Sequence, residues 1–400
     1  MSINLKRDIV ETIFSKSLIL LLNFVVVVMT THFWGDSGRG SIAIFVADLS
    51  LINIFANVFT GSSVSYFFSR MGKSKIATAA YLWAFLVAAI GGVFLFAIGQ
   101  TKLAPFVFIA SVMLGIVTFN NSVFIGDQKI GNYNLITILQ PALLIVFMLL
   151  FKFLLPQIEY YSYFFGQICS LLIVLLICRF LRHKCEIYNR WDFDREANKE
   201  IFSFGWKTEL SSLLQFLNYR LTYYMLDIYI GRGSVGIFSI GVTIAEAIWI
   251  VSRSMSMVQF SNVLKSGDNS STRNETSRIA LASLVISSLC IAVIAPLPKQ
   301  IFSFVFGEEF SGVGRIVLLL SPGILSIAFS NVLGNFLSAT RNLNILVVKS
   351  AVGVIFTIVL SLLLIPKLQI DGACVVNSVS YCVSSLVLIV YYYMPKKSRR

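Results

Sequence analysis

Five charged side chains stand inside long apolar stretches of this sequence, and they are the residues most able to carry chemistry. They are Lys16, Asp48, Arg220, Glu246 and Arg253. A charge at the centre of a bilayer is unfavourable by about 2.5–3.5 kcal/mol on insertion scales, so such residues face the protein interior or water, form pairs, or extend to the membrane surface. Cations in this setting bind anions, and carboxylates take up protons or cations.

Polar residues repeat at helical spacing around these charges. Three pairs are each separated by seven positions, which puts both members on one face of a helix. The pairs are Lys16 and Asn23, Arg220 and Asp227, and Glu246 and Arg253. Asp48 lies off the polar face of its own segment. These faces predict the walls of a hydrated cavity, in which the cations and the amides of Asn23 and Asn218 bind substrate.

A structural role is the alternative for each of these residues. Lys16 would extend to the membrane surface, and an amide such as Asn218 would bond to a neighbouring helix. The two arginines would only neutralise carboxylates, Arg220 with Asp227 and Arg253 with Glu246. The sequence leaves both interpretations open. For the carboxylates Asp48, Asp227 and Glu246, ion coupling is the further functional candidate.

Composition predicts that membrane-spanning helices position these residues. Hydrophobic residues make up 57% of the chain and charged residues 13%, whereas soluble domains average about 25% charged. Helices satisfy their own backbone hydrogen bonds in lipid, so an all-α polytopic membrane protein is expected. Stretches of about 20 mostly apolar residues, enough to span a bilayer, predict twelve spans, at roughly 9–31, 41–68, 76–99, 103–125, 133–154, 159–181, 204–228, 235–263, 277–297, 313–338, 343–365 and 371–394.

The charge distribution predicts the orientation. Lysine and arginine outnumber aspartate and glutamate by 32 to 19, a net charge of +13. About 20 of the bases fall in the connections on one side of the twelve-span scheme and about six on the other, and the basic side is cytoplasmic. Both termini are therefore expected in the cytoplasm. This asymmetry explains the positive net charge, so no nucleic-acid partner is needed to account for it.

The chain divides near its middle into two predicted six-helix halves. Residues 1–181 form the first half, 182–203 a charged cytoplasmic linker, and 204–400 the second half. The sequence Gly-Arg-Gly-Ser occurs at 38–41 and again at 231–234, between the first and second spans of each half. This repetition favours a parallel duplication, an arrangement that transporters use around a central cavity.

Local sequence signals predict two flexible points. The polar residues 265–277 predict a flexible cytoplasmic connection. Ser-Pro-Gly at 321–323, within an apolar segment, is the best hinge candidate.

The sequence lacks the motifs for nucleotide binding, metal binding and nucleophilic catalysis. No phosphate-binding Gly-x4-Gly-Lys-Ser/Thr motif, metal-ligand spacing or nucleophile elbow occurs. The chain has two histidines, and its six cysteines form no CxxC pair. We therefore expect no cofactor, no metal site and no enzymatic activity.

Several stretches resemble the Wzx-type polysaccharide flippases of the multidrug/oligosaccharidyl-lipid/polysaccharide exporter superfamily. One is Trp-Gly-Asp-Ser-Gly-Arg-Gly-Ser at 34–41, and another is Phe-Gly-Glu-Glu-Phe at 306–310. The others lie at 218–239, 337–342 and 364–373. Their order along the chain carries the resemblance, which covers almost the whole sequence.

The resemblance implies a bundle of two six-helix halves around a central cavity. It also implies a flippase that moves undecaprenyl-diphosphate-linked oligosaccharide from the cytoplasmic to the periplasmic leaflet of the bacterial inner membrane, by alternating access, for O-antigen or capsule synthesis. Lys16 and Arg253 match positions where related lipid II flippases place cavity arginines. Contact with polysaccharide polymerase machinery, and coupling to H⁺ or Na⁺, would fit the same role.

Two other functions remain as alternatives. The first is a cation-coupled multidrug exporter of the same superfamily, although such exporters often carry an acidic residue where this chain has Lys16. The second is a membrane polysaccharide polymerase or ligase, which typically has a large outer loop. The predicted outer connections of this chain are short, so the flippase is favoured over both.

Overall fold

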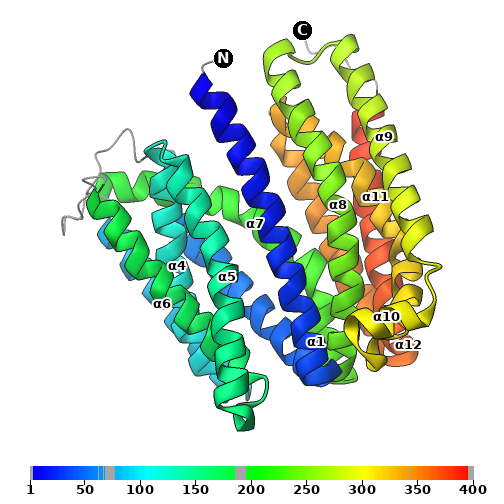
Figure 1. The fold of residues 1–400 in the computed structure, drawn as a ribbon. Coiled ribbons are helices and arrows are strands. Elements are labelled where there is room, and N and C mark those ends of the chain that lie inside the picture. Colours follow the sequence, from blue (N-terminus) through cyan, green and yellow to red (C-terminus); the bar gives the residue numbers. More distant parts are fainter. Residues whose placement is uncertain are drawn as a thin grey trace. The chain divides into compact units, whose positions relative to one another are not determined.

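The computed structural model describes residues 3–61, 63–65, 67, 77–184, 195–340 and 342–394, and the regular elements of these residues are all helical (Figure 1). The α-helices are α1 (Ile3–Thr60), α3 (Ala77–Ala97), α4 (Ala104–Gly126), α5 (Ile130–Leu154), α6 (Tyr161–Lys184), α7 (Arg195–Tyr229), α8 (Arg232–Ser266), α9 (Ser270–Ile294), α10 (Lys299–Phe306), α11 (Val313–Ala339) and α12 (Leu343–Tyr393). Two short 3-10 helices, η1 (Pro156–Ile158) and η2 (Glu308–Phe310), stand in the connections.

The helices confirm the predicted fold class. Within the described residues, nine helices are long and apolar enough to cross a membrane. Two of them, α1 and α12, contain a backbone break that divides each into two helices. The protein is thus a multi-pass membrane protein with about nine to eleven apolar helices. The number twelve, the cytoplasmic termini and the domain boundaries 1–181, 182–203 and 204–400 stay predictions.

The break in α1 lies at Gly35, between the first two predicted spans. Its φ of 60° and ψ of −161° are open to glycine and strained for other residues. A Cβ at Gly35 would also lie 2.6 Å from a carboxylate oxygen of Glu309. That carboxylate accepts a hydrogen bond from the Asp36 N–H, a backbone donor that a helix start otherwise leaves unsatisfied. The motifs at 34–41 and 306–310 therefore meet at one helix start.

The two copies of the Gly-Arg-Gly-Ser motif pack against each other. A Cβ at Gly40 would lie 1.8 Å from the Arg232 carbonyl oxygen, and one at Gly236 would lie 2.0 Å from the Asp36 carbonyl oxygen. Only residues without a side chain permit backbones this close. Arg39 Nε donates to Ser239 Oγ at 3.2 Å, which adds a polar contact. The repeated glycines thus serve helix–helix packing.

The break in α12 falls at Gln369, between the last two predicted spans. Its φ is 55° and its ψ is −127°, a conformation that a residue with a Cβ rarely adopts. Pro366 lies three residues earlier and lacks the N–H that would continue the helical bonding.

The chain forms two compact units. The N-terminal unit comprises Met1–Trp34 and Ile44–Leu213, and the C-terminal unit comprises Gly35–Ala43 and Leu214–Arg400. In the N-terminal unit, α4, α5 and α6 lie side by side (Figure 1). Arg182 of α6 is buried there and donates to Tyr81 Oη at 2.8 Å and Asn120 Oδ1 at 3.1 Å. This arginine therefore ties α6 to α3 and α4.

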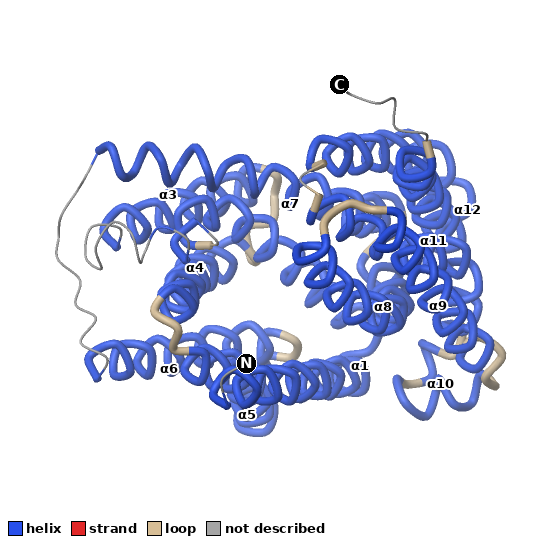
Figure 2. Tube along the Cα trace, turned by 90° about the horizontal axis from the view of Figure 1, so that it is seen from above, coloured by secondary structure: helices blue, strands red, loops and turns tan. Residues whose placement is uncertain are grey.

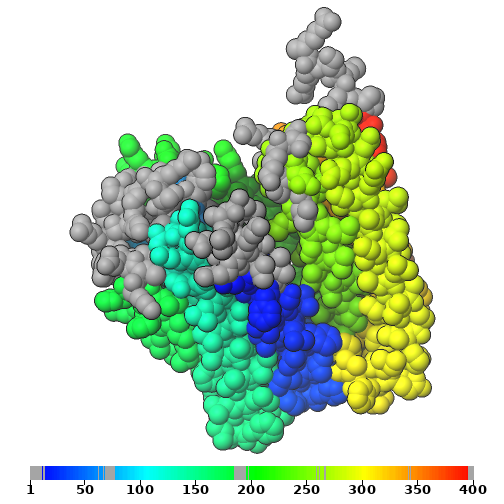
Figure 3. Space-filling model, turned by 45° about the horizontal axis from the view of Figure 1, so that its top comes forward, coloured from blue at the N-terminus to red at the C-terminus, as the bar shows by residue number. Residues whose placement is uncertain are grey.

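In the C-terminal unit α11 is the central helix. It packs against α8, α9 and α12, as the view from above shows (Figure 2). The core between them contains Leu333 and Phe336 of α11, with Leu388 and Tyr392 of α12. α9 and α10 form a continuous stretch of the surface (Figure 3). Large apolar side chains stand exposed on α9, as a lipid-facing helix requires: Leu281, Val285, Ile286, Leu289 and Val293.

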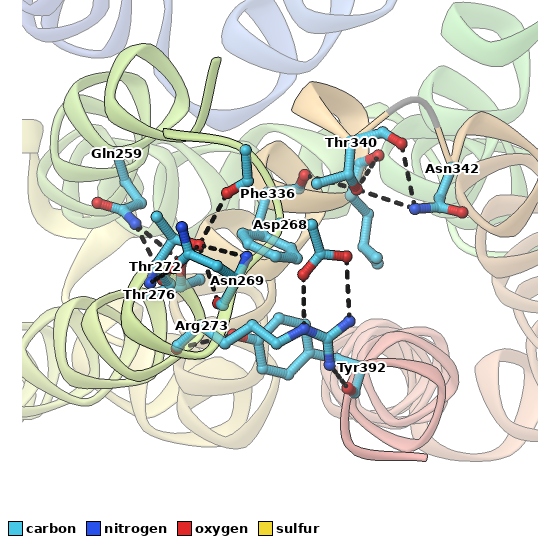
Figure 4. Close-up of polar contacts among 12 residues, drawn as sticks. Gln259, Asp268, Asn269, Thr272, Arg273, Thr276, Phe336, Thr340, Asn342 and Tyr392 are labelled. Carbon is cyan, nitrogen blue, oxygen red and sulfur yellow. Dashed lines mark hydrogen bonds and ion pairs between the residues drawn. The ribbon is translucent and has the colours of Figure 1, made fainter. Parts of the chain in front are cut away.

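The connection between α8 and α9 differs from its prediction as a flexible loop. It consists of Gly267, Asp268 and Asn269, because helices occupy the flanking polar residues. Asn269 and Thr272 exchange hydrogen bonds in a capping box, which starts α9 inside the polar stretch. Arg273 binds Asp268 at 2.8 Å and donates to the Tyr392 carbonyl at 3.1 Å, which ties the turn to the end of α12 (Figure 4).

Candidate functional site

A partly buried cation in the C-terminal unit joins α7 to α8. Arg220 of α7 forms an ion pair with Glu246 of α8, with Nη2 and Oε1 2.7 Å apart. Its Nη1 donates to the hydroxyl of Tyr223, one turn along α7, at 2.8 Å. The side chains of Arg220 and Glu246 remain 25% and 34% exposed. The pair is thus held by protein yet still accessible to a ligand.

Aromatic rings surround this pair. Tyr219 of α7, Trp249 of α8 and Tyr381 of α12 contact one another, with ring centroids 5.4–5.7 Å apart. The guanidinium of Arg220 lies 5.0 Å from the centroid of the Tyr223 ring. We call these six residues, Arg220, Glu246, Tyr219, Tyr223, Trp249 and Tyr381, the arginine–tyrosine cluster.

The ion pairs differ from those that sequence spacing suggested. Glu246 binds Arg220 and not Arg253, although Glu246 and Arg253 lie seven residues apart on one helix. Asp227 binds Arg232 at 3.0 Å, where α7 ends and α8 begins, and not Arg220. Spacing along one helix shows which residues share a face, whereas the partner on the adjacent helix depends on packing. Both suggested structural pairs are therefore wrong.

Two other predicted cations are exposed on their helices. The guanidinium of Arg253 on α8 forms no hydrogen bond or ion pair with any described residue, and the same holds for the ammonium of Lys16 on α1. An arginine guanidinium stays charged and offers a planar fork of donors, whereas a lysine offers a point charge. Arg253 therefore keeps its full donor set for an external anion.

The remaining predicted residues fall into different settings. Asn218 is buried and accepts a hydrogen bond from Thr357 of α12 at 2.9 Å, so its amide links two helices. Asp48 is buried in the N-terminal unit, 4% exposed. Asn23 stands on α1 at the edge of a pocket. Of the eight predicted residues, the structure brings together only Arg220 and Glu246 in a direct contact.

The pocket beside Asn23 lies wholly within the N-terminal unit. Its volume is about 410 Å³, and α1, α4, α5 and α6 supply its wall. Tyr133, Thr137 and Gln140 come from α5, and Tyr163 and Gln167 come from α6. None of its lining residues is charged. We call this feature the uncharged pocket.

Of the pocket residues, the sequence selected only Asn23 as a binding residue, although a signal for others was present. Tyr133, Thr137 and Gln140 are spaced by four and three positions, which marks one polar face of a helix. Tyr163 of α6 also lines the pocket and is 6% exposed. The tyrosines around Arg220 were also missed, since an aromatic residue in an apolar segment looks like core.

The two features favour different ligand groups. The arginine–tyrosine cluster and Arg253 offer guanidinium donors, which suit a phosphate or carboxylate. The uncharged pocket offers amides and hydroxyls, which suit a neutral polar group. Among the described residues, no group of three or more His, Cys, Asp or Glu is placed to hold a metal ion.

Comparison with known proteins gives one relative by sequence. No model of a known protein family matches the chain. The capsular polysaccharide biosynthesis protein CapF of Staphylococcus aureus is 25% identical over 304 residues, which cover 72% of this chain and 71% of that protein. This likeness is distant.

Solved structures give a clearer likeness in fold. An inward-facing multidrug resistance MATE family transporter of the MOP superfamily is 13% identical and superposes with a TM-score of 0.75, over 96% of this chain and 97% of its own. The MATE multidrug transporter DinF-BH gives 0.69 at 14% identity, covering 96% and 93%. The eukaryotic MATE transporter AtDTX14 gives 0.65 at 15% identity, covering 97% and 96%. The chain therefore has the fold of the MATE transporters.

Proposed function

We propose that this protein is a flippase for a lipid-linked oligosaccharide. Its substrate would be undecaprenyl diphosphate carrying an oligosaccharide, moved from the cytoplasmic to the periplasmic leaflet of a bacterial inner membrane by alternating access. The single observation that carries the proposal is the pair of accessible guanidinium groups at α8, which is long and apolar enough to cross a membrane. Arg253 stands on α8 itself, and Arg220 of α7 is bound to Glu246 of α8. Such cations are unfavourable in lipid unless they serve an anion.

The diphosphate is the group these arginines suit. A phosphate binds guanidinium through two parallel hydrogen bonds, which a single ammonium cannot provide. Arg253, exposed and without a partner among the described residues, would bind first. Lys16 of the N-terminal unit stays a separate candidate for substrate binding, since its ammonium offers an anion a point charge.

Arg220 would join the anion by exchanging partners. In the structure one of its terminal nitrogens binds Glu246 and the other binds the Tyr223 hydroxyl. A phosphate that replaces the Glu246 carboxylate keeps the guanidinium paired throughout, so Arg220 is never left as an uncompensated cation. Tyr223 holds the guanidinium in place during the exchange.

Glu246 is then the leading candidate for ion coupling. Released from Arg220, its carboxylate would take up H⁺ or Na⁺ among the surrounding tyrosines, because an unpaired anion there is unfavourable. Asp227 is already paired with Arg232 at a helix end, and Asp48 is buried in the N-terminal unit. We therefore rank these two carboxylates behind Glu246.

The distant relative supports the same class of substrate. CapF is a capsular polysaccharide biosynthesis protein, and a lipid-linked oligosaccharide is a building block for such polymers. Cytoplasmic termini and contact with polysaccharide polymerase machinery belong to this proposal. A multidrug exporter of the same fold is the alternative.

Transport in reconstituted vesicles tests the proposal. Purified protein is placed in vesicles with fluorescent undecaprenyl-diphosphate oligosaccharide, and the label reaching the opposite leaflet is measured over time. We expect movement well above that of protein-free vesicles, and no gradient-driven export of an organic dye cation. Export of the dye without movement of the lipid would favour the multidrug exporter and refute the flippase.

A further inference from the structure

We propose that the uncharged pocket of the N-terminal unit is a binding site for neutral sugar units. The inference rests on the proposed function, because the sugars would be those of the lipid-linked substrate. The volume of about 410 Å³ falls within the range of about 300–1,000 Å³ that small-molecule sites occupy. Its position within one unit separates it from the arginine–tyrosine cluster.

Three carboxamides carry the argument. Asn23 of α1, Gln140 of α5 and Gln167 of α6 all line the pocket. Their side chains form no hydrogen bond with other described residues, although Gln167 is only 6% exposed. Most buried amides in folded proteins are bonded to a neighbour. Gln167 is thus a buried amide left unbonded at the pocket. The more exposed Gln140 and Asn23 add amides from two other helices, and together the three indicate groups available to a ligand.

The chemistry of these groups matches sugar hydroxyls. A carboxamide has a donor and an acceptor, and so does a hydroxyl. A sugar hydroxyl can therefore donate a hydrogen bond to the amide oxygen or accept one from the amide NH₂. Pro141 lacks the N–H that would bind the Thr137 carbonyl in a regular helix, so the carbonyl oxygen of Thr137, which also lines the pocket, is a further acceptor. The rings of Tyr133 and Tyr163 offer apolar faces with polar tips, which suit the C–H face of a sugar ring.

The lining also excludes charged ligands. No lysine, arginine, histidine, aspartate or glutamate belongs to it. A cationic drug or a phosphate would lose its hydration there without a counter-charge, which is strongly unfavourable. A neutral ligand rich in hydroxyls avoids this penalty. A sugar is therefore the class that the pocket fits, and the diphosphate must bind elsewhere.

A pair of substitutions in the pocket tests the assignment. Gln140→Leu with Gln167→Leu removes both amides and keeps side chains of similar length. In vesicles, the half-saturating concentration of the glycosylated lipid should rise about tenfold or more, the loss expected for two hydrogen bonds. The value for sugar-free undecaprenyl diphosphate should not change. An equal change for both lipids, or none for either, would overturn the sugar site.

Two further variants distinguish a loss of sugar binding from a loss of folding. Gln300→Leu makes the same chemical change on α10, where Gln300 is exposed and outside the pocket, and it should behave as wild type. Tyr133→Phe removes one hydroxyl and keeps the ring, so it should fold even where the double substitution does not. It should raise the half-saturating concentration of the glycosylated lipid about fivefold. Wild-type values for Tyr133→Phe and for the folded double variant would refute the proposal.

A binding measurement separates this inference from the proposed function. Detergent-solubilised protein is titrated with a mixture of soluble, uncharged, lipid-free oligosaccharides. Saturable binding by wild type and Gln300→Leu, lost in the Gln140→Leu, Gln167→Leu variant, supports the sugar site even where vesicles show no flipping. Vesicles that flip the lipid, combined with identical oligosaccharide binding by both glutamine variants, would retain the flippase and reject the pocket.

Discussion

At the scale of single residues, the ion pair between Arg220 and Glu246 decides between a structural and a substrate-binding role. If the pair only neutralises two charges, removing both should restore what removing one destroys. If Arg220 binds the diphosphate, Arg220→Ala with Glu246→Ala should still lower the flipping rate about 10- to 100-fold, because a hydrogen bond to a charged group contributes about 1.5–3 kcal/mol. Flipping by single and double variants at matched expression provides the measurement. Wild-type rates in the double variant would show a structural pair.

The sequence could identify these residues but not their partners. Charged residues in apolar segments are unusual enough to select Arg220, Glu246 and Arg253 directly. Helical spacing then relates residues within one helix, and here it suggested Glu246 with Arg253. The actual contact crosses from α7 to α8, and it depends on how two helices rotate against each other. The relative rotation of two packed helices cannot be predicted from the spacing of residues within either helix.

At the scale of helices, the backbone break in α1 at Gly35 is the structural feature with the best-defined cause. Gly35→Ala should lower the melting temperature of the detergent-solubilised protein, since alanine is strained at this backbone conformation and its Cβ meets Glu309. A destabilisation of at least about 1–3 kcal/mol is expected. Gly312→Ala is the matched control, because a Cβ there meets no atom within 4 Å. Equal melting temperatures for the two variants would contradict the assigned role of Gly35.

The start of α9 gives a second prediction for a single helix. Asn269→Ala removes the side chain that accepts from the Thr272 N–H, and loss of such a cap costs about 0.5–2 kcal/mol of stability. Asn274→Ala changes an exposed asparagine inside α9 and should not destabilise, because alanine favours helices. Thermal unfolding of both variants measures the difference. A stable Asn269→Ala variant would show that the turn does not depend on its cap.

Most helix positions could be predicted, and the exceptions have local causes. Apolar length located the spans, and both chain breaks fall between predicted segments, at Gly35 and Gln369. The hinge expected at 321–323 is absent, because α11 runs unbroken through Pro322. There a Cβ on Gly323 would lie 2.8 Å from the Ser378 Cα, so close packing explains this glycine. Proline is tolerated in membrane helices where neighbouring groups satisfy the freed carbonyl.

At the scale of the whole molecule, the basic connections predict the topology. Reporter fusions after residues 70, 190, 270 and 398 should report the cytoplasm, and fusions near 36, 232 and 308 should report the outside. The reason is the excess of lysine and arginine in the first set of connections. Enzymatic reporters active on one side of the membrane provide the measurement. An outside signal at 190 would refute twelve spans with cytoplasmic termini.

The central claim is that a guanidinium in the membrane binds the diphosphate of a lipid-linked oligosaccharide. Flipping of this lipid by the Arg253→Ala and Arg253→Lys variants in vesicles tests it most directly, because the Arg253 side chain has no hydrogen bond or ion pair with a described residue whose loss could mimic the effect. We predict that the alanine variant folds and inserts but does not flip the lipid. The lysine variant should recover part of the rate, since one point charge replaces a planar fork. Wild-type flipping by Arg253→Ala would contradict the claim.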